Sequence, residues 1–303
     1  MTKRIKNGEL SLSPVAIRLL DAAVDIQQNP DATDKAYMAR QLVQCTLPHS
    51  NPGNEPIWSR TNGNLTLSIQ PHIDRKTRKT LYPYGTIPRL LLFWMVTEAT
   101  QTKSRRLRLG HSLAGFMREV GLNPDTGGGK RSDAVRLRDQ MTRLLRATIS
   151  FEQNYANGHS WLDMQIGPEA VLWWNPDKTF QDDLFESWVE LGEKFYQAVT
   201  AAPVPLDMRA LKALKKSPLA LDLYSWLAYK TWNAARKGEP QAVNWVGLHA
   251  QMGSDYSDIN NFKKKVRAIL PRVQQVYPQM KVTQNSAGLL IKPAPPAIPP
   301  RIR

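Results

Sequence analysis

The stretch of residues 103–155 constrains the fold more than any other part of the chain. It reads KSRRLRLGHSLAGFMREVGLNPDTGGGKRSDAVRLRDQMTRLLRATISFEQNY. Its hydrophobic spacing predicts a short basic strand, a short helix over 112–120, a glycine-rich turn, a longer helix over 132–147 and a strand. Asn157-Gly158 is a strong hairpin signal and predicts a second strand over 160–166. This order is typical of a winged helix-turn-helix, with the hairpin as the wing.

The longer helix has two chemically different sides. Its apolar side contains Ala134, Leu137, Met141, Leu144 and Leu145. Its polar side contains Ser132, Arg136, Asp139, Arg143 and Arg146. Arginine suits an acidic polymer, because its planar fork binds phosphates and guanine edges in pairs. A solvated surface helix would show the same pattern, so it is the neighbouring elements that favour a DNA-binding helix.

The charge of the chain agrees with a nucleic-acid partner. The 303 residues carry a formal net charge of +15, and 42% of them are hydrophobic, enough for a packed core. Such an excess favours a polyanionic partner, either nucleic acid or an acidic membrane surface. A single cysteine excludes intrachain disulfides and cysteine-rich zinc sites. The absence of long apolar runs or a secretion signal predicts a cytoplasmic protein without membrane contact.

The second half of the chain repeats this order of elements. We expect a helix over 217–234, a short strand over 241–243, a short helix over 245–252, a long basic helix over 257–277 and a hairpin over 282–291. The apolar side of that long helix contains Phe262, Val266, Ile269, Val273 and Val276. Its outward side contains Asn260, Lys264, Arg267, Pro271 and Gln275, with Lys263 and Lys265 beside them.

The predicted fold class is therefore α+β and mostly helical, with two tandem winged-helix domains after an N-terminal helical extension. Residues 1–60 form the extension and a linker, with helices over 14–27 and 31–45. The first winged helix spans 61–176, including a half-buried strand over 65–69, and the second spans 201–292. An acidic connector covers 177–200, and it either docks a protein or is an ordinary solvated connector. The proline-rich tail, 293–303, is expected to be disordered.

The sequence contains no recognisable catalytic motif. Gly129-Lys130-Arg131-Ser132 is not a phosphate loop, because Ser or Thr must follow the lysine directly. The five histidines are widely separated, which disfavours a metal-dependent nicking enzyme. We therefore expect a protein that is not an enzyme and that uses no metal or cofactor.

Several short motifs resemble plasmid replication initiators of the RepA type. They are Pro83-Tyr84-Gly85, Pro88-Arg89-Leu90-Leu91, Thr97-Glu98, Thr102-Lys103-Ser104, Leu109-Gly110, Phe116-Met117 and Arg138-x-Gln140-Met141. The second basic helix, KKKVRAILPRVQQVYP, is similar to the recognition helix of iteron-binding initiators.

This resemblance implies a bacterial protein that binds short direct repeats (iterons) at a plasmid origin through two winged helices. It also implies origin opening, recruitment of the host replication initiator and helicase, and copy-number control. Monomers would act at the origin, and dimers would repress the protein's own promoter. The strand over 65–69 and the first two helices are the expected dimer surface.

The predicted DNA-binding residues form two groups that enter successive major grooves, about 10 base pairs apart on one side of the duplex. The groove residues are Ser132, Arg136, Asp139, Arg143 and Arg146 in one helix, and Asn260, Lys264, Arg267 and Gln275 in the other. Asp139 either orients an arginine or accepts from cytosine; a surface counter-charge is an equal alternative. The phosphate contacts are Arg105, Arg106, Arg108, Lys263 and Lys265.

Two other functions remain open at this point. A winged-helix transcriptional regulator would use the same modules without opening an origin, and a rolling-circle nickase is a less favoured alternative. Tandem direct repeats beside an AT-rich tract would indicate an initiator, whereas a lone inverted repeat at a promoter would indicate a repressor.

Overall fold

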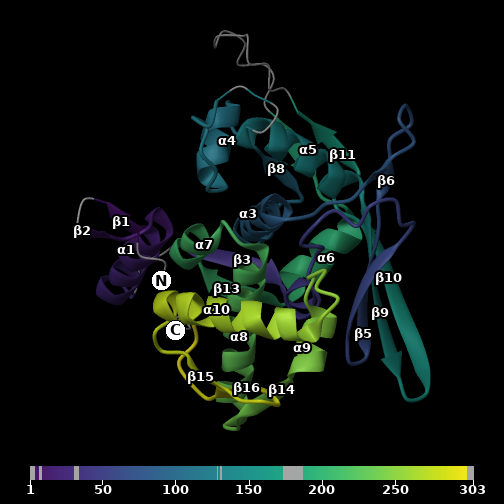
Figure 1. The fold of residues 1–303 in the computed structure, drawn as a ribbon. Coiled ribbons are helices and arrows are strands. Elements are labelled where there is room, and N and C mark those ends of the chain that lie inside the picture. Colours follow the sequence, from purple (N-terminus) through teal and green to yellow (C-terminus); the bar gives the residue numbers. More distant parts are fainter. Residues whose placement is uncertain are drawn as a thin grey trace. The chain divides into compact units, whose positions relative to one another are not determined.

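The computed structural model describes residues 4–6, 9–30, 34–127, 129, 132–172 and 187–298. The chain divides into two compact units. Unit 1 contains residues 1–36, 204–249 and 256–303, and unit 2 contains residues 37–203 and 250–255. The helices and strands are labelled in Figure 1. The division differs from the predicted domains, because the N-terminal residues do not form a unit of their own.

Unit 2 is built around one largely buried helix, α3 (Thr86–Thr102). Every residue from Ile87 to Thr97 is buried, as expected for a helix that is apolar on all sides. The other helices of the unit are α2 (Arg40–Gln44), α4 (Leu113–Glu119), α5 (Asp133–Arg146) and α6 (Glu193–Ala201), and both α5 and α6 pack on α3.

A four-stranded antiparallel sheet completes one side of unit 2, in the order β10-β9-β5-β4. Its strands are β4 (Trp58–Asn62), β5 (Leu65–Gln70), β9 (Thr148–Tyr155) and β10 (Gly158–Gln165), and the last three are the long strands of Figure 1. Leu67 and Ile69 of β5 are fully buried. Because β5 is paired on both edges, it has no free edge to offer the dimer surface predicted for it.

A second sheet of unit 2 joins the basic strand to the predicted connector. Strand β8 (Arg106–Arg108) pairs with β12 (Trp188–Glu190), which pairs with β11 (Glu169–Val171). Val189 in β12 and Phe195 in α6 are buried. The described end of the connector therefore belongs to the core of unit 2; residues 173–186 lie outside the described part of the chain.

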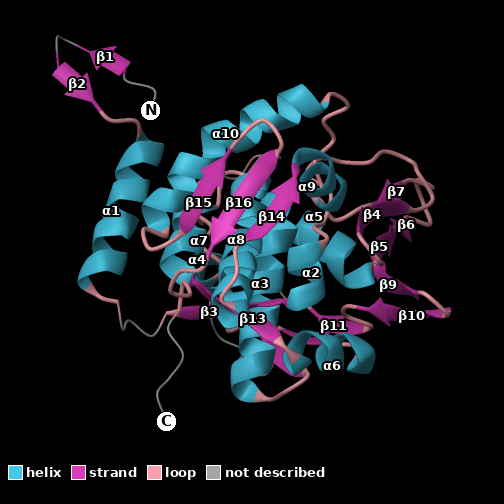
Figure 2. Ribbon diagram, turned by 90° about the horizontal axis from the view of Figure 1, so that it is seen from below, coloured by secondary structure: helices cyan, strands magenta, loops and turns pink. Residues whose placement is uncertain are grey.

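Unit 1 contains the second predicted module. Its central helix is α8 (Pro218–Lys237), followed by β14 (Gln241–Asn244), α9 (Trp245–Gln251), α10 (Ile259–Val276), β15 (Lys281–Gln284) and β16 (Gly288–Lys292). The sheet order is β14-β16-β15, and β16 packs on α8 (Figure 2). Gly288 permits this pairing, because a Cβ there would lie 1.9 Å from the carbonyl oxygen of Val243.

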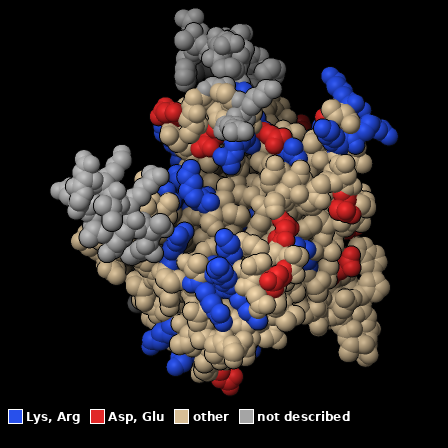
Figure 3. Space-filling model, viewed as in Figure 1, with Lys and Arg blue, Asp and Glu red and all other residues tan. Residues whose placement is uncertain are grey.

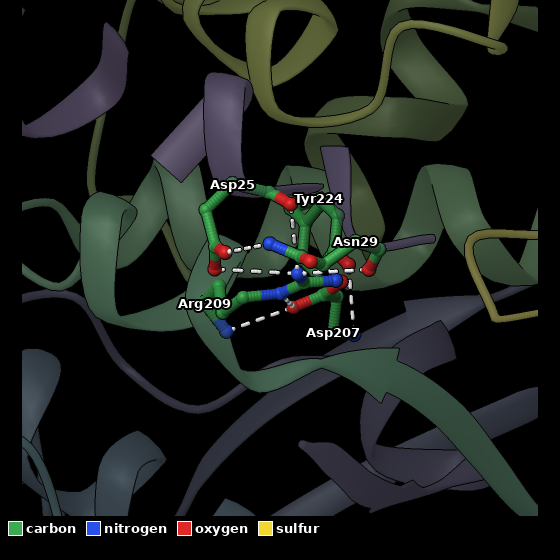
Figure 4. A network of polar contacts seen from close by, with 5 residues as sticks. All are labelled: Asp25, Asn29, Asp207, Arg209 and Tyr224. Carbon is green, nitrogen blue, oxygen red and sulfur yellow. Dashed lines mark hydrogen bonds and ion pairs between the residues drawn. The ribbon is translucent and has the colours of Figure 1, made fainter. Parts of the chain in front are cut away.

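A polar network fastens the N-terminal helix α1 (Pro14–Gln28) to α7 (Met208–Leu214) within unit 1 (Figure 4). Arg209 donates to Asp207 at 2.7 Å and 3.0 Å, to Asp25 at 3.2 Å and to the carbonyl oxygen of Asn29 at 3.1 Å. Tyr224 accepts the backbone N–H of Asp207. Since α1 also packs on α10, the network supports the helix that carries more basic residues than any other described helix of this unit.

Two local predictions were wrong. Residues 31–45 are not a helix, because β3 (Lys35–Ala39) precedes the short α2; residues 31–33 are not described. The described part of the tail is docked, since Ala294 and Ile298 are buried and the Tyr277 hydroxyl donates to the carbonyl oxygen of Pro295 at 2.7 Å. Proline lacks a backbone donor, so this segment buries apolar groups without needing strand partners. Residues 299–303 lie outside the described part.

Candidate nucleic-acid interface

Helix α5 buries the apolar stripe that the sequence predicted. Leu137, Met141, Leu144 and Leu145 are all buried, which fixes the opposite side outward. Ser132 is the N-cap, and its hydroxyl accepts the backbone N–H of Val135 at 3.3 Å. Only 4% of Ser132 is exposed, so this predicted groove residue instead begins the helix.

The remaining predicted residues of α5 differ in how freely they face solvent. The Arg136 side chain is 52% exposed and lies 3.1 Å from Asp133, and Arg146 is exposed at the end of the helix. The Arg143 side chain is only 14% exposed, because it is held by Asp139 at 2.8 Å and lies over the ring of Tyr84. Asp139 therefore forms an ion pair with Arg143, which fits both the predicted arginine-orienting role and the surface counter-charge.

The basic strand β8 is largely neutralised by the acidic segment that pairs with it. Arg105 lies 2.6 Å from Glu193 and 3.7 Å from Glu190. Arg106 donates to Glu190 at 3.1 Å and stacks on the ring of Trp188. Because these guanidinium groups already have carboxylate partners, they are weaker candidates for phosphate contact than the sequence suggested. Arg108 is exposed.

Helix α10 presents a broader basic surface. Asp258 caps it by accepting the backbone N–H of Asn260 at 2.8 Å. Its buried stripe is Phe262, Val266, Leu270, Val273 and Val276. Leu270 is buried and Ile269 only half-buried, so the stripe is turned slightly from the predicted one.

This rotation of the buried stripe changes which cations lie at the centre of the outward side of α10. Asn260, Lys264, Lys265 and Arg267 are exposed, whereas Lys263 and Gln275 are half-buried. Arg267 lies over the ring of Trp245, 5.4 Å from its centroid, which limits the directions it can take. Lysine and arginine side chains gather over this helix in Figure 3.

Arg272 was not among the predicted site residues, but it is exposed on the same side of α10 as Lys264 and Lys265. The signal was available, because residue 272 follows residue 265 by seven positions and residue 264 by eight, and therefore shares their side of a helix.

The described residues bring together no metal-binding cluster. No group of three or more His, Cys, Asp or Glu side chains lies close enough to hold a metal ion in that part of the chain. Cys45 is fully buried, and burial raises the pKa of its thiol to about 12, so it stays protonated at neutral pH. Among the described helices none is long and apolar enough to cross a membrane.

The comparisons with known proteins give the family. A family model described as "Plasmid encoded RepA protein" matches residues 82–246, more than half of the chain. The chain belongs to this family. The predicted resemblance is confirmed, and it places the chain among plasmid replication initiators rather than in an enzyme family. The match ends at residue 246, before α10.

Two crystal structures of RctB are among the solved structures that resemble this chain. One, of selenomethionine derivatives of domains 2 and 3, has 12% identity and a TM-score of 0.49, covering 83% of this chain and 97% of that chain. The other, of RctB domains 2 and 3, has 9% identity and a TM-score of 0.42, covering 82% and 94%. No curated protein matches the sequence significantly.

The motif residues that carry the family resemblance have structural roles in unit 2. Arg89 is buried and donates to the carbonyl oxygens of Leu47, Pro48 and Gly85 at 2.6–3.1 Å. Gln140 accepts the backbone N–H of Tyr84 at 2.9 Å. These contacts fix α3 and α5 against the segments beside them, so the motifs set the position of the candidate DNA-facing helix.

Proposed function

We propose that this protein initiates plasmid replication by binding repeated duplex sites at an origin through two winged-helix modules. One observation carries the proposal: α5 and α10 each bury an apolar stripe and turn several cations outward. A basic helix fixed in this way matches the width of the major groove and the charge of the phosphates.

The arrangement of the strands supports a winged helix most directly in unit 1. There, β14 pairs with β16, which pairs with β15, so the strand before α9 joins the hairpin after α10. Unit 2 has the same order of elements, but β8 pairs with β12 instead of with the hairpin after α5. The first module is therefore the more divergent of the two.

The exposure of each predicted DNA-binding side chain decides which role we propose for it. Arg136, Arg146, Asn260, Lys264 and Arg267 are proposed to read base edges, with Arg272 beside them. Arg108, Lys263 and Lys265 are proposed to contact phosphates, and Asp139 to hold Arg143 beneath the interface. Ser132, Arg105, Arg106 and Gln275 are proposed to act indirectly, because they are capping, paired or half-buried.

We further propose that binding opens adjacent AT-rich DNA and recruits the host initiator and helicase, in the bacterial cytoplasm. A dimer in equilibrium with the monomer would repress the protein's own promoter. These steps follow from membership of the family, and each can be tested separately from DNA binding.

Footprinting on the DNA beside the gene is the deciding experiment. We expect protection of tandem direct repeats next to an AT-rich tract, followed by permanganate-sensitive bases in that tract when the protein is bound. Protection of a single inverted repeat without base exposure would instead indicate a transcriptional regulator.

A further inference from the structure

The hairpin that follows α5 carries no positive charge. Strands β9 and β10 and the turn between them, residues 148–165, contain no lysine or arginine but contain Glu152 and Asp163. Trp161 is 63% exposed and stacks on His159. A wing of this composition would be repelled by a phosphate backbone, so the predicted wing of the first module lacks the chemistry of a DNA-contacting arm.

A second hairpin in unit 2 has the opposite composition. Strands β6 (His72–Ile73) and β7 (Thr80–Leu81) pair, and the turn between them exposes the four cations Arg75, Lys76, Arg78 and Lys79. Among the described residues, no carboxylate lies within ion-pair distance of these four. Figure 1 shows the tip of this turn beside the label β6, and basic side chains project at the same place in Figure 3.

The one acid of this turn is used internally. The Asp74 carboxylate accepts the backbone N–H groups of Lys76 at 2.8 Å and Thr77 at 2.7 Å, and these bonds hold its pKa below the usual range. Arg78 has a φ of +59°, a left-handed conformation that is uncommon for arginine. The turn is thus held in one shape while its cations are left facing solvent.

The sheet register brings the start of this hairpin to the end of α5. Gln70 of β5 pairs with Thr148 of β9, two residues after Arg146. His72 follows Gln70 by two residues, and burial, with the charge of Arg146, lowers its pKa. The first strand of the hairpin and the last turn of α5 are therefore neighbours.

The far end of the hairpin is also fastened to α5. Tyr82, directly after β7, accepts from Nη1 of Arg143 through its carbonyl oxygen at 3.4 Å. Two residues later, the backbone N–H of Tyr84 donates to Gln140 at 2.9 Å. The hairpin therefore begins beside the last turn of α5 and is hydrogen-bonded to that helix just after it ends, so its direction from α5 is set at both ends.

We propose that the β6–β7 hairpin, and not β9–β10, is the arm of the first module that contacts DNA phosphates. Arg75, Lys76, Arg78 and Lys79 would grip the backbone beside the groove that α5 enters. This inference rests on the proposed function of α5. It leaves β9–β10, with Trp161, facing away from the duplex.

The test uses pairs of substitutions that change net charge equally. R75Q/K76Q and R78Q/K79Q remove cations but keep Asp74 and the turn, and R236Q/K237Q removes the same charge from the exposed end of α8.

Binding to origin DNA and to a random duplex of equal length is titrated over a range of salt concentrations. Each hairpin variant is expected to lower the slope of log K against log salt by roughly two, about one per lost phosphate contact, with the preference for origin DNA retained. The α8 variant is expected to keep the wild-type slope.

Three outcomes would overturn the inference. Hairpin variants with the wild-type slope would show that the arm does not reach DNA, and an equal loss in R236Q/K237Q would show an effect of net charge alone. Tighter binding by E152Q/D163Q would show that β9–β10 faces the phosphates. Wild-type protein that fails to prefer origin DNA would instead refute the proposed function, so the two failures are distinguishable.

Discussion

Helices α5 and α10 present the same kind of surface by different means. In α5, four arginines are mixed with two aspartates, and its Arg136 and Arg143 lie in ion pairs with Asp133 and Asp139. In α10, three lysines and two arginines occur without any acidic residue between Ile259 and Val276. In α5, ion pairs with the aspartates fix the directions of two arginines. In α10, no acidic residue offsets the positive charge of the lysines and arginines.

The positions of the cations along α5 and α10 show which of the two basic surfaces helix stability alone can explain. Arg143 and Arg146 lie in the last turn of α5, where cations are favourable, so helix stability alone accounts for them. Lys263, Lys264 and Lys265 lie in the second turn of α10, far from the last turn, so the helix dipole gives them no such stabilisation. A function that needs positive charge explains their position, and α10 is therefore the stronger case even though the sequence pointed first to α5.

The largest expected effect is the loss of folding stability when the Arg209 network that supports α10 is broken. Replacing Arg209 with alanine leaves the buried Asp207 without its partner and releases α1, which should lower the free energy of unfolding by about 3–5 kcal/mol. Urea unfolding and hydrogen exchange of the individual helices would measure it. We expect α10 to lose protection while α5 keeps it, and Arg209→Lys to lose less. Equal loss in both helices would show that the network does not act on α10 selectively.

The next effect concerns base reading by α5. Arg136→Ala should cost about 1–3 kcal/mol of binding to origin DNA and reduce the preference over random DNA. Arg136→Lys is the matched control, since it keeps the charge but loses the planar fork. Competition titrations measure both. Unchanged preference in the alanine variant would remove Arg136 from the set of base contacts.

A smaller effect is expected at a phosphate contact of α10. Lys263→Ala should weaken binding to all duplexes alike and flatten the salt slope by about one. Lys263→Arg should keep the slope, because it preserves the charge. A change in sequence preference on removing Lys263 would instead place Lys263 among the base contacts.

The smallest effect is on the pH dependence of the network behind α10. A hydrogen bond from Asn29, with the contact to Arg209, holds the pKa of Asp25 below its ordinary value. A lowered folded-state pKa stabilises the protein above the unfolded pKa, about 4, and this contribution is lost as the pH falls through the folded value. The difference in unfolding free energy between wild type and Asp25→Asn should therefore shrink on acidification. A constant difference down to pH 2 would contradict this assignment.

The helices around the predicted interface were readable from the sequence because their signals are local. Ser132, Ser217 and Asp258 cap helices where they were expected to begin, and apolar spacing marked the buried sides. The strand over 35–39 was misread, because Tyr37 and Met38 allow either state and strand pairing is a tertiary contact. The acidic connector was misread for the same reason, since only its pairing with β8 buries Val189.

The sequence by itself determined the family, the order of elements in the two basic modules and the excess of positive charge, because these depend on neighbours within a few residues or on composition. Only the tertiary structure decided which cations are free. Strand register and helix packing paired Arg105 and Arg106 with Glu190 and Glu193, buried Arg143, exposed Arg272 and set the β6–β7 hairpin against α5. Ion pairing depends on distance in space, which spacing along the chain does not fix.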